Sequence, residues 1–234
     1  MFLNFKHTIL SETDDYIIIN KPPFISVLED RVEETDLLTL ARDYFPGASA
    51  CHRLDKETTG VLVFSKNEGA YKHLALQFEK RTVEKTYHAI VEGVPGSKHF
   101  ELNAPLKVSG VEVFVHPEGK PSLTIAKVLD VYKKHTLLEC KISTGRRHQI
   151  RVHMASAGHP VVHDTLYGGK PVFLSEVKRN YNLKKWEEEE SLSKRVALHA
   201  LTVRFRGIND EELFFEAPYP KDFRALVRQL EKNR

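Results

Sequence analysis

The residues with the clearest capacity for chemistry lie in the segment HRLDKETTG, at 52–60. It places Arg53 and Asp55 on either side of a leucine, in what reads as a loop that enters a strand at Gly60. A carboxylate beside a cation is held in its ionised form and can act as a base or nucleophile. An Arg-x-Asp pair is also typical of surface ion pairs, which contribute little stability. The segment alone leaves both interpretations open.

A second candidate is the segment KTYHA, at 85–89, in which Lys85 and Tyr87 alternate along a predicted strand. An aromatic side chain in a strand is ordinarily a core or edge residue. Tyrosine can also stack on a planar ligand and exchange a proton through its hydroxyl. The pattern does not decide between these roles.

The third candidate is a basic cluster in TGRRHQIRVH, at 144–153. It brings Arg146, Arg147, His148 and Arg151 to the predicted start of a helix. Backbone N–H groups and the helix dipole attract anions at such a position, so phosphate binding is a specific expectation here. A basic face that serves only solubility remains the alternative.

Other kinds of catalytic site find little support. The histidines show no HExxH spacing, and there is no Cys/His quartet that would hold zinc. Cys51 and Cys140 form no CxxC pair, and no GxSxG nucleophile motif is present. The chain also lacks GxGxxG and Walker loops. We therefore expect neither a metal nor a cofactor.

Composition is that of a globular protein, with 41% hydrophobic and 29% charged residues in 234. The net charge is only +3, so the distribution of positive charge matters more than its sum. The N-terminus does not resemble a signal peptide, and no apolar run approaches the roughly 20 residues of a membrane helix. We expect a soluble, cytoplasmic protein with reduced cysteines and no membrane partner.

The predicted elements mix strands and helices without regular alternation, which indicates an α+β sheet domain over 1–234. The stretch 171–195 ends in KKWEEEESLSKR and is predicted to be an insertion or exposed segment. A Thr cap is expected before the first helix, and Asn67 is expected to cap the second. Between 103 and 129 we expect short strands and turns. The expected strands are 16–20, 60–66, 85–93, 135–143, 195–205 and 212–218, and the expected helices 35–45, 67–80, 223–234 and one that follows Gly145 and ends at Gly158 and Pro160.

Taken together and in this order, the three segments resemble the motifs of the RluA-type family of RNA pseudouridine synthases. HRLDKETTG resembles the catalytic motif, KTYHAIVEG the tyrosine-bearing strand, and TGRRHQIRVHMASAGHPVVHDTLYGG the third motif. YIIINKPP and ALHA resemble the N-terminal and C-terminal strands of the family. The resemblance covers nearly the whole chain. It implies a mixed, largely antiparallel central sheet flanked by helices, with a basic cleft.

The resemblance also implies roles for individual residues. Asp55 matches the catalytic aspartate, Tyr87 the tyrosine that stacks on the target base, and Arg151 the arginine that pairs with the aspartate. Arg53 matches the arginine that fills the place left by the extruded uridine. Further RNA contacts fall to His52, Lys85, Arg146 and His148. The implied partner is RNA, either rRNA or tRNA, the implied cofactor is none, and a monomer is the expected state.

The chain departs from the family pattern in several places. Only about twenty residues precede the N-K-P turn, too few for the small RNA-binding domain that many members carry. The following PPFISVLED lacks the usual glycine and His-Pro ending, Thr59 replaces a common serine, and His163 stands where glycine is usual. Two other functions stay open at this point: an RNA-binding module without catalysis, and a metal-dependent nuclease.

Overall fold

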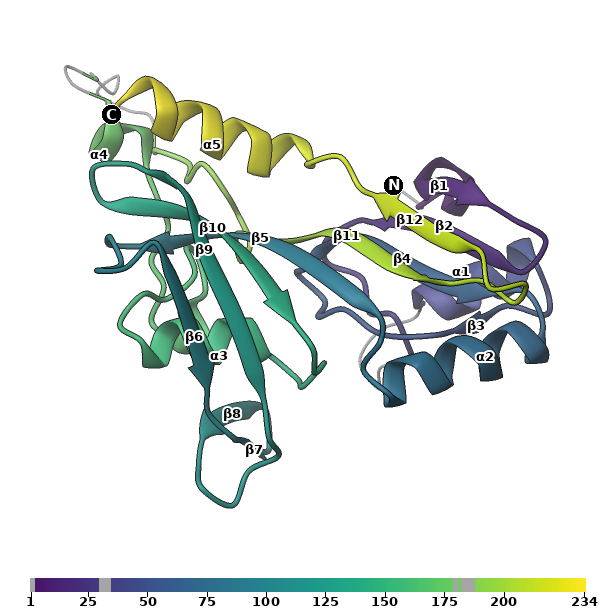
Figure 1. Cartoon of the computed structure of the whole chain (residues 1–234). Coiled ribbons are helices and arrows are strands. Elements are labelled where there is room, and N and C mark those ends of the chain that lie inside the picture. Colours follow the sequence, from purple (N-terminus) through teal and green to yellow (C-terminus); the bar gives the residue numbers. More distant parts are fainter. Residues whose placement is uncertain (1–2, 30–34, 179–180, 182–187) are drawn as a thin grey trace. The chain divides into compact units, whose positions relative to one another are not determined.

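The computed structural model describes residues 3–29, 35–178, 181 and 188–234 (Figure 1). The chain forms two compact units, one of Met1–Thr86 with His199–Pro218 and the other of Tyr87–Leu198 with Tyr219–Arg234. The chain passes between them within β5 (Glu84–Glu92), within β11 (Leu198–Arg206) and between Pro218 and Tyr219. The expectation of one domain over 1–234 stays a prediction.

The first unit is a sheet in the order β1-β2-β4-β11, in which β3 also pairs with β4 and β12 with β11. The β4 and β11 strands run parallel, and the other pairs in this unit are antiparallel. The unit also holds two helices and a 3₁₀ turn, η1. The bounds are η1 Phe5–Thr8, β1 Ile9–Glu12, β2 Tyr16–Lys21, α1 Leu37–Tyr44, β3 Ser49–Ala50, β4 Thr59–Ser65, α2 Glu68–Glu79 and β12 Glu212–Glu216.

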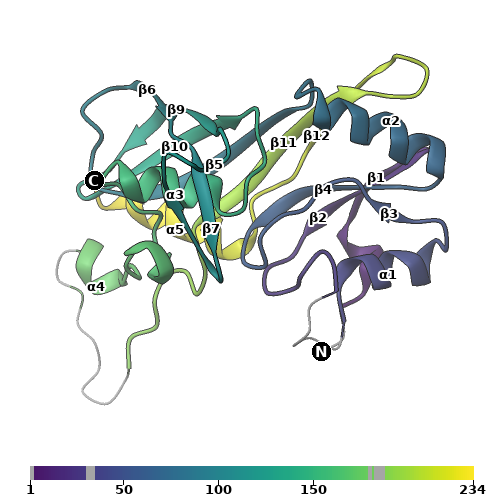
Figure 2. The same ribbon diagram turned by 90° about the horizontal axis from the view of Figure 1, so that it is seen from below.

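The alternation of side chains along β2 and β4 explains how the two helices of this unit pack. Ala70 and Leu74 of α2 join one buried cluster with Tyr16 and Val63, and the Tyr16 hydroxyl donates to the Ala70 carbonyl at 3.2 Å. The next residue along β4, Phe64, points to the other face, where it meets Phe5. Figure 2 shows α2 and α1 on either side of these strands.

One of the two predicted helix caps is confirmed by the structure, and the other is corrected. Asn67 caps α2 as predicted, with its side-chain oxygen accepting from the Ala70 N–H at 2.8 Å. The first helix was expected to follow a threonine cap, but Asp36 caps it by accepting from the Thr39 N–H at 3.0 Å. An aspartate is at least as good an N-cap as threonine, which explains the shift by one residue.

The second unit contains the strands β5-β10-β9-β6 in that order, with β10, β9 and β6 antiparallel, and a separate β7–β8 hairpin. Figure 1 shows this hairpin at one end of the unit and α4 with the C-terminus at the other. One correction concerns β9, a nine-residue strand in a region where only short strands were expected. The bounds are β6 His99–Asn103, β7 Leu106–Ser109, β8 Glu112–Val115, β9 Leu123–Val131, β10 His135–Ile142, α3 Gln149–Ser156, η2 Thr165–Tyr167, α4 Leu174–Val177 and α5 Lys221–Lys232.

The stretch 171–195 lies partly outside the described residues, so its predicted exposure is not tested there. Its described ends include buried side chains. Val172 is buried, and the fully buried Arg195 donates to Asp222 at the start of α5 through Nε at 2.7 Å and Nη2 at 3.1 Å. The strand expected over 195–205 begins only at Leu198.

The predicted fold class is confirmed: both units combine helices with mostly antiparallel strands. In the part of the chain that the structure describes, no helix is long and apolar enough to cross a membrane.

Candidate active site

A buried lysine fixes the loop that carries Asp55. Lys21 is fully buried at the end of β2, and its ammonium donates to the carbonyls of Pro22 at 2.8 Å and Lys56 at 2.9 Å. The Phe24 N–H also donates to the Lys56 carbonyl at 2.9 Å. Asp55 itself is partly exposed, one residue before this anchor. The N-K-P turn and the HRLDKETTG loop are therefore one local structure, although 30 residues separate them.

The other end of the loop is fixed to β11. The Thr59 hydroxyl donates to His199 Nδ1 at 2.8 Å, and His199 Nε2 donates to the Ala217 carbonyl at 3.0 Å. Threonine supplies the same hydroxyl as the serine common in the family, so this departure preserves the bond. Gly60 adopts φ +116°, and a Cβ there would lie 2.0 Å from the Ala200 carbonyl oxygen. Glycine is required at this position.

A histidine and a lysine pack around one aromatic ring in the first unit. His52 Nε2 accepts the Val63 N–H at 3.2 Å, and its ring centroid lies 5.1 Å from that of Phe78. The Lys85 ammonium lies 5.4 Å from the same Phe78 centroid. Burial, with a smaller effect of the Lys85 charge, lowers the pKa of His52 to about 3. The contact of His52 with RNA stays a prediction, and a neutral imidazole ring would make it. Arg53, next in the chain, is exposed.

Burial also lowers the pKa of Lys85 from 10.5 to about 8. Between these values the unfolded chain binds more protons than the folded one, so stability rises with pH in that window. We expect Lys85→Met to raise the free energy of unfolding by about 2 kcal/mol at pH 7, a gain that shrinks as pH rises from 8 to 10.5. Urea titrations at both ends of the window measure it.

The control for this prediction is Lys80→Met, which removes an exposed lysine and should change stability by less than about 0.5 kcal/mol. A Lys85→Met protein less stable than wild type at pH 7 would contradict the burial penalty. A polar group that lowers the stability of the fold is characteristic of a functional site.

The basic third segment is organised by a buried glutamine. The Gln149 side-chain oxygen accepts from the Thr144 hydroxyl at 2.7 Å and the Arg146 N–H at 3.1 Å, while its amide donates to the Leu123 carbonyl at 2.9 Å. The helix begins only at Gln149, so Arg146, Arg147 and His148 precede it in a turn. The expectation that they open the helix is corrected: His148 is the N-cap residue, with φ 53°.

Arg151 faces the interior of the second unit and forms a bidentate pair that the sequence did not suggest. Its Nε donates to Asp164 Oδ2 at 2.6 Å and its Nη2 to Oδ1 at 2.7 Å. The guanidinium carbon lies 5.1 Å from the Tyr167 ring centroid. The Tyr167 hydroxyl contacts His148 Nδ1 at 2.7 Å and accepts the Val113 N–H at 3.0 Å. One turn of chain thus holds both Arg151 and His148.

His163, where glycine is usual in the family, directly precedes Asp164. It adopts φ 62°, a left-handed conformation that favours glycine and is costly for other residues. Its N–H donates to the Lys170 carbonyl at 2.8 Å. The departure therefore leaves the backbone of the turn in the conformation that glycine would adopt.

A basic groove of about 460 Å³ lies beside the β7–β8 hairpin in the second unit. Arg146 and Arg147 line it with Lys107 and Lys120, and Glu118 pairs with Lys107 at 2.7 Å. The buried Arg146 Nε has no hydrogen-bond partner among the residues that the structure describes. The excess of positive charge in the lining of this groove is suited to phosphate oxygens.

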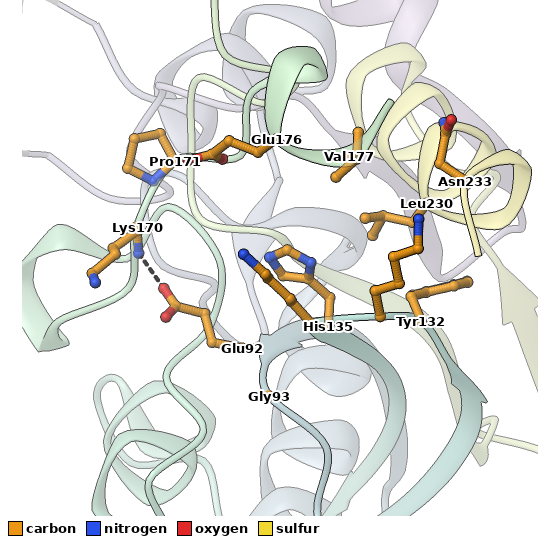
Figure 3. Close-up of a pocket in the computed structure, with 12 residues that line it drawn as sticks. Glu92, Gly93, Tyr132, His135, Lys170, Pro171, Glu176, Val177, Leu230 and Asn233 are labelled. Carbon is orange, nitrogen blue, oxygen red and sulfur yellow. Dashed lines mark hydrogen bonds between the residues drawn. The ribbon is translucent and has the colours of Figure 1, made fainter. Parts of the chain in front are cut away.

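Another cavity, of about 290 Å³, lies in the second unit at the opposite end of β5 and β10 from Tyr87 and the third segment (Figure 3). Figure 3 shows Glu92 reaching the backbone nitrogen of Lys170, with Glu176 and His135 nearby. Carboxylates and amines share this cavity, and it contains none of the predicted site residues.

The structure thus groups the predicted residues in two sets. His52, Arg53, Asp55 and Lys85 belong to the first unit, and Tyr87, Arg146, His148 and Arg151 to the second. Tyr87 is buried on β5. The pairing of Asp55 with Arg151 stays a prediction. Within the described residues, no group of three or more His, Cys, Asp or Glu side chains could hold a metal ion.

Comparison with known proteins identifies the class. The RNA pseudouridylate synthase family pattern matches residues 15–156. The ribosomal large subunit pseudouridine synthase D of Haemophilus ducreyi is 36% identical over 98% of this chain and 72% of its own length. The Escherichia coli protein of the same name is 34% identical over 94% of this chain and 69% of its own. The structure of human RNA pseudouridylate synthase domain containing 1 is 26% identical, with TM-score 0.70, over 91% of this chain and 83% of that one.

These matches define an enzyme class, the isomerases that convert uridine to pseudouridine within RNA. The chain belongs to the RNA pseudouridylate synthase family.

Proposed function

We propose that the chain isomerises a uridine of large-subunit ribosomal RNA after flipping it out of the RNA stack, with Asp55 as the essential carboxylate. Two of the similar proteins are named for the ribosomal large subunit, which supports this RNA over tRNA. The observation that carries the catalytic assignment is the buried Lys21 anchor, which fixes the loop one residue after Asp55. A cytoplasmic location and a monomeric state stay predictions.

The reaction breaks the bond from ribose C1′ to N1 of uracil and joins C1′ to C5 of the turned base. The proton on C5 leaves for solvent and N1 gains one, so every atom and charge is conserved. The step therefore consumes no oxidant, reductant or phosphate donor. Asp55 must be ionised to attack the sugar or to remove a sugar proton, and either route requires a carboxylate held in place.

Flipping is needed because the reacting atoms are covered in stacked RNA, and it costs a few kcal/mol. The exposed Arg53 can offset part of this by stacking its planar guanidinium in the vacated space. Tyr87 offers an aromatic surface for the extruded base, a contact worth about 1–3 kcal/mol. Arg151 is the cation that orients the Asp55 carboxylate in this proposal, through a rigid fork of donors.

The basic groove should hold the RNA backbone. We expect Arg146→Gln to weaken RNA binding about tenfold at low salt and to reduce the slope of log Kd against log salt by about one, because one phosphate contact is lost. Fluorescence anisotropy with a ribosomal RNA stem-loop at several salt concentrations measures both. Arg228→Gln, a change on the exposed side of α5, is the matched control. An unchanged salt slope in Arg146→Gln would remove the groove from the RNA interface.

The substrate assignment is tested by mapping pseudouridines in total RNA from a strain lacking this gene and from its parent. We expect at least one large-subunit rRNA position to remain uridine in the deletion strain and to be restored by the wild-type gene. Loss of a tRNA pseudouridine with rRNA intact would overturn the rRNA assignment while keeping the activity.

A further inference from the structure

Asp164 uses its whole carboxylate on Arg151. Both oxygens accept from the guanidinium, at 2.6 and 2.7 Å, and the side chains are 0% and 9% exposed for Asp164 and Arg151. Two charge-assisted bonds from a rigid fork fix the plane of the guanidinium as well as its position. The Tyr167 ring, 5.1 Å from the guanidinium carbon, restricts it further.

The turn that contains Asp164 does not need this carboxylate. Asp164 is the N-cap residue of η2, where an aspartate side chain usually accepts a backbone N–H. Within the described residues, its carboxylate makes no such cap bond. The turn is closed instead by the Asp164 carbonyl, which accepts from Tyr167 N–H at 3.0 Å and Gly169 N–H at 2.8 Å. The carboxylate is directed at Arg151.

We propose that Asp164 is a positioning residue for the isomerisation, setting the orientation in which Arg151 meets the catalytic carboxylate. This rests on the proposed function, in which Asp55 reacts and Arg151 orients it. Asp164 acts only through Arg151 and does not touch the substrate.

The same turn links the catalytic cation to RNA binding. Tyr167 packs on Arg151 through its ring and contacts His148 through its hydroxyl, at 2.7 Å. His148 follows the two arginines that line the basic groove. The segment HDTLYGG, 163–169, therefore supports both functions with one short piece of backbone. Within this segment, Asp164 is the residue that affects the isomerisation.

The test is a double-mutant cycle on single-turnover tritium release from RNA labelled at uracil C5. Asp164→Asn keeps the shape and removes the charge. We expect it to slow release about 100-fold while RNA affinity changes less than about threefold, because positioning affects the transition state more than binding. In an Arg151→Lys background the same change should slow release less than about threefold, since the fork it positions is already gone.

The matched control is Asp222→Asn. Asp222 forms another bidentate pair with a buried arginine in this unit, with Arg195 at 2.7 and 3.1 Å. The change should lower thermal stability as Asp164→Asn does, yet leave the release rate within about twofold of wild type. A merely structural role for Asp164 would make the two variants behave alike.

Three results overturn the inference: wild-type release by Asp164→Asn, equal slowing in both backgrounds, or equal slowing by Asp222→Asn. If Asp164→Asn fails to fold, Asp164→Glu takes its place, because it keeps the charge but displaces it by about the length of one methylene. We then expect slow tritium release with unchanged RNA affinity. A folded Asp164→Glu that releases tritium at the wild-type rate would also refute positioning. Failure of the wild-type protein to release tritium instead refutes the proposed function itself.

Discussion

Asp55→Asn should reduce isomerisation below detection while leaving RNA affinity within about threefold of wild type. Asparagine has nearly the shape of aspartate, so the loop anchored by Lys21 and Thr59 should keep its conformation. It cannot be ionised, so it cannot attack the sugar or accept a proton. Loss of an essential nucleophile or base costs many orders of magnitude in rate when it acts with its partners as a unit.

Tritium release from RNA labelled at uracil C5 measures this effect, and anisotropy measures binding of the same RNA. The control is Glu57→Gln, which removes a carboxylate two positions along the same loop and should keep most of the activity. Release by Asp55→Asn at a rate near that of wild type would show that the carboxylate is dispensable, and Asp55 would lose its role.

Arg151→Lys should slow single-turnover catalysis about 100- to 1,000-fold although the charge is kept. Lysine is a point charge without the planar fork, so it cannot bind both Asp164 oxygens and orient a second carboxylate. The change should also destabilise the unit by about 2 kcal/mol, because the buried Asp164 would lose part of its pairing.

The variant Arg195→Lys distinguishes an effect of lost stability from an effect on catalysis. It breaks the same kind of bidentate pair at Asp222 and should cost similar stability, with release close to the wild-type rate. Near-normal release by Arg151→Lys would contradict the requirement for the fork. Equal slowing by both variants would assign the effect to general destabilisation.

The sequence predicted the elements best where local signals were strong. The strand at 16–20 and the Asn67-capped helix follow from a buried apolar run and a good N-cap, and the structure has both. The start of the first helix moved because threonine and aspartate stand side by side and both can cap. The long β9 was missed because its residue types do not follow its burial: Ile125, Leu129 and Val131 lie on the exposed face, whereas Thr124 is fully buried.

The residues of the candidate site could be predicted from the sequence, but the side chains that hold them in place could not. Asp55, Tyr87 and Arg151 stand out through motifs, but the partner of Arg151 within its own unit is Asp164, 13 residues away. No helical or strand periodicity joins these two positions, because a turn with His163 at φ 62° lies between them. The roles of Lys21 and His199 were equally hidden, since both act across long sequence separations.

The most direct test is nucleoside analysis of a large-subunit ribosomal RNA transcript incubated with the purified wild-type protein. After digestion, chromatography coupled to mass spectrometry should show pseudouridine in place of a defined uridine, at unchanged mass, with none formed by the Asp55→Asn protein. An RNA in which uridine is fully retained with the wild-type protein, or pseudouridine formed equally by both proteins, would contradict the account.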